Sequence, residues 1–154
     1  MSGVRFLPLL LLLSPQSAQA QRIREFQFQG VATFAAARFV GGGIGLGIRP
    51  PGRLGFLLSA SGGDLEGVVA GRAEALTVFR LSPYATKGVI PYSAAGLAVL
   101  ARKARGDGYL TMVLGLESRP GAKSGWFLEA GFGGGVRVSA GVRIRRITPA
   151  RARR

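Results

Sequence analysis

Residues 136–145, VRVSAGVRIR, alternate an apolar side chain with a small or charged one at every position. Neighbouring side chains of a β-strand point to opposite faces, so this period of two predicts a strand with one apolar and one polar face. The apolar face would consist of Val136, Val138, Ala140, Val142 and Ile144, opposite Arg137, Ser139, Gly141, Arg143 and Arg145.

The same alternation continues upstream. In residues 124–132, Trp126 shares a face with Leu128, Ala130 and Phe132, and residues 109–118 behave alike. Stretches rich in Gly, Pro and Asp interrupt the chain and predict turns. Together they predict eight strands, at 26–40, 44–49, 53–61, 65–81, 88–102, 108–118, 125–132 and 135–146. The first turn is expected at Gly41–Gly43, with Ala35 to Arg38 as the alternative.

Two environments are compatible with alternating strands. In a soluble β-domain the apolar face points inward, whereas in a transmembrane barrel it points out to lipid. The polar face carries small residues and charges, and the whole chain has three Lys and no Asn, which is unusual for a solvated sheet. We therefore expect an all-β, antiparallel up-and-down meander closed into a small, about eight-stranded transmembrane barrel. The alternative is a soluble exported β-barrel that binds a lipid or other apolar ligand.

The N-terminus has the features of a secretory signal peptide. Arg5 precedes the apolar run FLPLLLLL, and Ala18-Gln19-Ala20 fits the cleavage pattern, so residues 1–20 are the expected signal peptide. The apolar run has eight residues, too few to cross a bilayer core, which needs about 20. Residues 21–147 would then form the barrel and 148–154 a basic tail, either solvated or in contact with anionic headgroups or peptidoglycan.

Mass spectrometry of the exported protein checks this prediction. The mature chain is expected to start at Gln21, because a signal peptidase reads the small residues Ala18 and Ala20. A folded envelope protein that still carries Met1 would contradict it.

Four charged residues fall on the polar faces of adjacent predicted strands. They are Glu117, Glu129, Arg137 and Arg143. Inside a narrow barrel such charges must pair, because an isolated buried charge is costly. We expect a lumen charge network, rather than a glycosidase-like pair of Glu117 and Glu129.

Aromatic residues lie near the predicted strand ends, as the aromatic girdles of membrane barrels require. The expected interfacial aromatics are Phe26, Phe79, Tyr109, Trp126 and Phe132.

The composition favours a protein without catalysis. With no His there is no general base that titrates near neutral pH, and with no Cys there is neither a thiol nucleophile nor a thiolate metal site. We expect no enzyme activity, no cofactor and no metal. The net charge of +14 favours a polyanionic partner, and for an exported chain that partner is anionic lipid rather than nucleic acid.

The C-terminal region, about residues 88–146, resembles the outer membrane protein β-barrel domain group of small bacterial porin-like proteins. The motifs are P-Y-x-x-x-G-x-G, then G-L-E-x-R, then an aromatic-led strand with an inward acid, then V-x-x-G-V-x-x-R. Here these positions are Pro91, Tyr92 and Gly96; Gly115, Leu116, Glu117 and Arg119; Trp126 and Glu129; and Val138, Gly141, Val142 and Arg145.

This resemblance implies location in the Gram-negative outer membrane and insertion by the barrel-insertion machinery. Members of the group usually end on an aromatic residue that this machinery reads. The present sequence ends RIRRITPARARR, so the signal would be internal, around Ile144 or Ile147.

Overall fold

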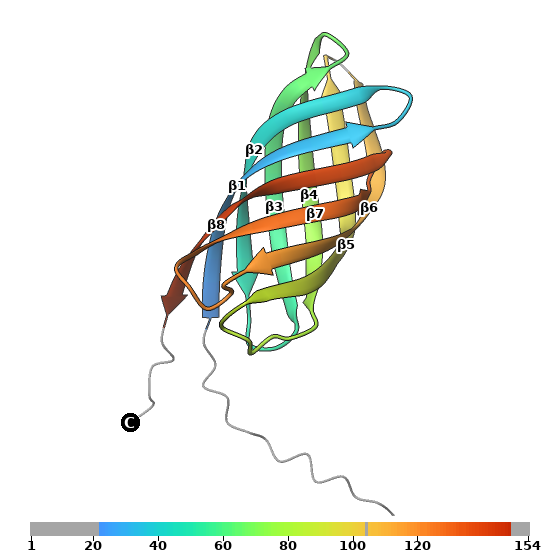
Figure 1. Cartoon of the computed structure of the whole chain (residues 1–154). Coiled ribbons are helices and arrows are strands. Elements are labelled where there is room, and N and C mark those ends of the chain that lie inside the picture. Colours follow the sequence, from blue (N-terminus) through green and yellow to red (C-terminus); the bar gives the residue numbers. More distant parts are fainter. Residues whose placement is uncertain (1–21, 104, 149–154) are drawn as a thin grey trace, which may run out of the picture.

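The computed structural model describes residues 22–103 and 105–148, and in them eight strands form one closed antiparallel barrel (Figure 1). Each strand pairs with the next along the chain, and β1 pairs with β8 to close the barrel. The all-β closed meander predicted from the alternation is confirmed. The strands are β1 (Arg22–Phe34), β2 (Arg38–Arg49), β3 (Leu54–Leu65), β4 (Val68–Arg80), β5 (Val89–Arg102), β6 (Arg105–Ser118), β7 (Ser124–Phe132) and β8 (Val136–Thr148).

The connections fall at two ends of the barrel. The β1–β2, β3–β4, β5–β6 and β7–β8 turns lie at the upper end in Figure 1, which we call the mouth. The longer β4–β5 connection, the β2–β3 and β6–β7 connections, the start of β1 and the end of β8 lie at the opposite end, which we call the base.

The expected first turn at Gly41–Gly43 is wrong. These glycines lie inside β2, and the chain turns at residues 35–37, the alternative position. Gly41 and Gly43 are needed because β2 and β3 approach closely. A Cβ on Gly41 would lie 2.6 Å from the carbonyl oxygen of Gly62.

Two other turns are shorter than predicted. Residues 61–64 belong to β3, and the chain reverses at Glu66 and Gly67, both with positive φ. The Gly67 N–H donates to Asp64 Oδ1 at 3.0 Å and holds this turn. Residues 105–107, which the prediction left between two strands, also belong to β6.

Side chains alternate between the two faces of the barrel wall. Outward positions are apolar and exposed, including Leu110, Met112 and Leu114 on β6, at 66–78% exposure. Inward positions form two small apolar clusters, one around Tyr92 and Leu76 and one around Phe39 and Leu65. Polar and charged side chains occupy the space between them.

Among the described residues, no helix is long and apolar enough to cross a membrane. The predicted signal peptide, and the predicted tail apart from Thr148, lie outside the described residues.

Candidate functional site

The lumen holds four glutamates and six arginines, each no more than 7% exposed. They come from six of the eight strands. Within each strand, every second side chain points inward. They are Glu25, Glu74, Glu117, Glu129, Arg49, Arg72, Arg80, Arg137, Arg143 and Arg145. Arginine suits this setting, since its planar fork can serve two carboxylates at once.

Glu129 lies at the centre of this network. Its Oε1 accepts from the Tyr92 hydroxyl at 2.7 Å and from Arg143 Nη2 at 3.2 Å. Its Oε2 accepts from Ser139 Oγ at 2.8 Å and from Arg137 Nη1 at 2.9 Å. Four donors therefore satisfy a carboxylate that is 1% exposed.

Toward the base, Arg143 connects Glu129 to a second group of charges around Glu117. Its Nη1 donates to Glu117 Oε2 at 3.0 Å, and its guanidinium stacks 4.5 Å from the centre of the Phe127 ring. Arg80 and Arg145 then each bridge Glu117 and Glu25. The six ionic contacts of Arg80, Arg143 and Arg145 tie β1, β4, β6, β7 and β8 together across the lumen.

Toward the mouth, Arg137 binds Glu74 through two parallel hydrogen bonds. Its Nε lies 2.9 Å from Oε1 and its Nη2 2.8 Å from Oε2. Arg72 shares the same carboxylate, with its Nε donating to Oε1 at 2.8 Å. The network therefore runs along the barrel from Arg72 to Glu25.

The structure brings together all four charges predicted from the sequence. Arg143 contacts both Glu117 and Glu129, and Arg137 contacts Glu129. Both carboxylates are buried and held by arginines, which favours the ion-pair interpretation over a catalytic pair.

Sequence reasoning did not assign the other six lumen charges to the network, although Arg145 falls on the predicted polar face of residues 136–145. The signal was present in the same alternation: in RIREFQFQ, Glu25, Gln27 and Gln29 share one face and Phe26 and Phe28 the other. The expected first strand begins at Phe26 and therefore excludes Glu25, whereas β1 begins four residues earlier, at Arg22.

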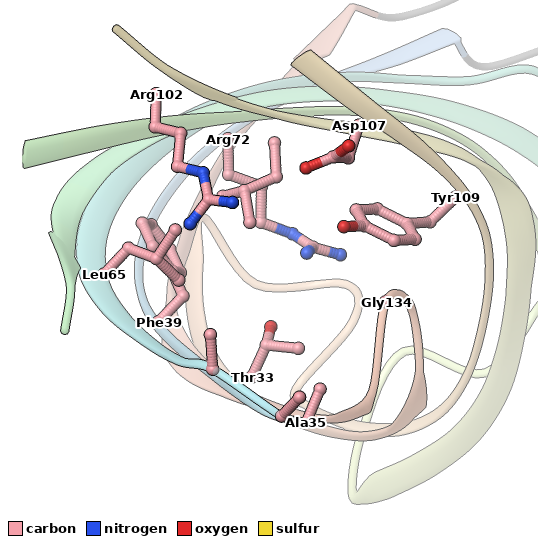
Figure 2. Close-up of a pocket in the computed structure, with 12 residues that line it drawn as sticks. Thr33, Ala35, Phe39, Leu65, Arg72, Arg102, Asp107, Tyr109 and Gly134 are labelled. Carbon is pink, nitrogen blue, oxygen red and sulfur yellow. The ribbon is translucent and has the colours of Figure 1, made fainter. Parts of the chain in front are cut away.

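The expected interfacial aromatics divide into two groups. Phe79, Trp126 and Phe132 are exposed on the outer wall, and Phe26 is half-buried there against Phe28, with ring centres 5.0 Å apart. The prediction that Tyr109 is an interfacial aromatic is wrong: its side chain occupies an inward position of β6 and lines the mouth (Figure 2). The parity of β6 decides this, since its outward row is Leu110, Met112, Leu114 and Leu116.

Within the described ranges, no group of three or more acidic, His or Cys side chains could hold a metal ion. No protein-family model and no curated protein sequence matches the chain. Among solved structures, the chain is similar to the N-terminal β-barrel domain of OprF from Pseudomonas aeruginosa. The TM-score is 0.63 at 16% identity, and the match covers 81% of this chain and 97% of that one. The fold of this chain is therefore that of a small, eight-stranded outer-membrane β-barrel.

Proposed function

We propose that this protein resides in the outer membrane of a Gram-negative envelope and has a structural or interaction role without catalysis. The observation that carries the proposal is the outer wall, where large apolar side chains are exposed on every strand. Examples are Leu46 at 61%, Leu58 at 63% and Leu97 at 61% exposure. A soluble monomer rarely exposes a continuous apolar surface of this extent, whereas a lipid-embedded barrel requires one.

The dimensions and the aromatic residues agree with a bilayer. The strands have 9 to 14 residues, and a tilted spanning strand needs about 9–11. Phe56, Phe79 and Trp126 lie on the outer wall near the base, and Phe34 and Phe132 near the mouth. Two belts of aromatics suit the two membrane interfaces.

The lumen supports a structural role rather than a pore. Arginine and glutamate side chains from opposite walls meet inside it, so the charges satisfy one another instead of lining an open path. The soluble alternative needs an apolar interior for its ligand. The apolar part of this lumen is limited to two small clusters separated by the charge network.

The proposal includes an orientation. The even number of strands places the start of β1 and the end of β8 together at the base, and export from the inner side would leave the base in the periplasm. The mouth, with its short turns, would then face outward. Turns this short favour an anchor or an interaction within the envelope over a large adhesive surface.

Two partners belong to the proposal. Anionic lipids would contact the basic residues of the protein, and the barrel-insertion machinery would insert the barrel into the outer membrane.

Membrane fractionation tests the proposal. The protein is expected to stay with outer membranes washed in alkaline carbonate and to require detergent for extraction. The reason is that moving its apolar outer wall from lipid into water is unfavourable. A periplasmic binding protein analysed in the same fractions is the control. Recovery of the chain in the carbonate wash, folded and free of detergent, would refute a membrane-spanning barrel.

A further inference from the structure

A cavity of about 170 Å³ opens at the mouth of the barrel and is lined by both apolar and polar side chains (Figure 2). The apolar part of the lining includes Phe39, Leu65 and Leu100. The polar part consists of Arg72, Arg102, Thr33, Tyr109 and Asp107, with Arg102 on the side of Leu65 and Phe39. Arg102 and Asp107 are exposed at the rim, whereas Arg72 is 2% exposed at the floor.

The Arg72 guanidinium is only partly paired. Its Nε donates to Glu74, and its Nη2 also lies 2.8 Å from that carboxylate, but the alignment does not make a hydrogen bond. Nη1 and Nη2 thus have no hydrogen-bond acceptor among the described residues. Glu74 already accepts two bonds from Arg137, so it cannot fully neutralise Arg72.

Unsatisfied polar atoms gather at this end of the barrel. Within the described part of the chain, the buried side-chain atoms without a hydrogen-bond partner belong to Thr33, Arg72 and Thr111. Thr111 Oγ1 and Arg72 Nη2 lie 2.7 and 2.8 Å from the point that a Cβ on Gly133 would occupy. Buried polar groups are normally paired, so a cluster of unpaired donors indicates a missing acceptor.

We propose that the mouth is a binding site for a small monocarboxylate with a short apolar tail. Neither Nη1 nor Nη2 of Arg72 makes a hydrogen bond. Nη2 makes only its ionic contact with Glu74, so this planar end of the guanidinium can also face a carboxylate, and the Thr33 hydroxyl can add a donor. The lumen holds two more arginines than glutamates (6 − 4), so an anion also reduces its excess positive charge. The tail would pack on Phe39, Leu65 and Leu100, and Arg102 at the rim would attract the anion.

The inference rests on the barrel fold. Only the side of the membrane to which the site opens depends on the proposed function, so a negative binding result leaves the membrane assignment intact.

Butyrate is the probe. Backbone amide shifts of the folded, full-length protein in detergent would be followed by NMR during titration. We expect saturable shifts at Thr33, Gly133 and Gly134, with a Kd on the order of millimolar for so small a ligand. Butan-1-ol, which lacks the charge, is expected to bind at least about tenfold more weakly. A Kd for butyrate above roughly 100 mM would overturn the proposal. So would tighter binding of inorganic phosphate than of butyrate.

Three variants assign the site. Arg72→Gln is expected to weaken butyrate binding at least about tenfold, because it removes the charged fork. Arg102→Gln should weaken it several-fold, and Arg105→Gln should leave it unchanged. Arg105 is the matched control, since it is exposed and pairs with Arg102 across β5 and β6 but does not line the cavity.

If Arg72→Gln fails to fold, the comparison of Arg102→Gln with Arg105→Gln still tests the site. Both residues are exposed, so neither substitution should prevent folding. Equal butyrate affinity in Arg102→Gln and Arg105→Gln would refute the site, as would full affinity in a folded Arg72→Gln protein.

Discussion

Replacing Glu129 with alanine is expected to lower the free energy of unfolding by about 3–5 kcal/mol, the usual cost of removing one partner from a buried ion network. The substitution takes away the acceptor of four hydrogen bonds. It also raises the excess of arginines over glutamates in the lumen from two to three (6 − 3). Urea unfolding from lipid vesicles, followed by the fluorescence of the single tryptophan, Trp126, measures the change.

Two controls separate burial from charge. Glu129→Gln retains the shape and an acceptor oxygen, so it should cost less than alanine. Glu66→Gln removes a negative charge from an exposed turn, and its expected cost is about 0–1 kcal/mol. A cost for Glu129→Ala within that same small range would mean that the lumen is hydrated and that the network contributes little to stability.

The second large effect is expected on the outer wall. Val138→Arg should destabilise the folded protein in lipid by about 1–3 kcal/mol, because Val138 faces outward within the apolar row of β8. It lies two residues from the start of β8, so the cost falls between that of a charge at the interface and that of a charge at the bilayer midplane. Val138→Leu, which keeps the site apolar, should be nearly neutral. The comparison uses unfolding from vesicles of one lipid composition.

The position along the strand provides a further control. Val136 lies at the end of the same row, next to the turn at the mouth, so Val136→Arg should cost clearly less than Val138→Arg. In a soluble barrel, Val138 would be an exposed residue in water and arginine there would be harmless. A neutral Val138→Arg in lipid would therefore contradict the membrane-spanning barrel.

The alternation in the sequence was sufficient for much of the fold. It predicted eight antiparallel strands, the face of β8 that carries Arg137 and Arg143, and the inward direction of Glu117 and Glu129. This was possible because the side-chain period of a strand is a local property of the backbone, independent of which strand lies next to it.

The turns were predicted less well, since glycine has two uses in this barrel. Gly67 lies in a reversal and has a positive φ, whereas Gly41 and Gly43 lie in a strand because a side chain there would collide with β3. The sequence shows a glycine in both cases and does not tell a turn position from a close approach of two strands. Only the register between β2 and β3 distinguishes them, and that register depends on how the barrel closes.

The pairing of charges was also decided by the tertiary structure. Closure of β8 on β1 brings Arg145 within 3.1 Å of Glu25, 120 residues earlier, and Arg137 reaches Glu74 across the lumen. The sequence by itself determined which side chains point inward, because alternation along a strand is local. The diameter and stagger of the closed barrel decide which inward charges meet, and why two nitrogens of Arg72 at the mouth have no hydrogen bond. This diameter and stagger arise only when all eight strands are in register.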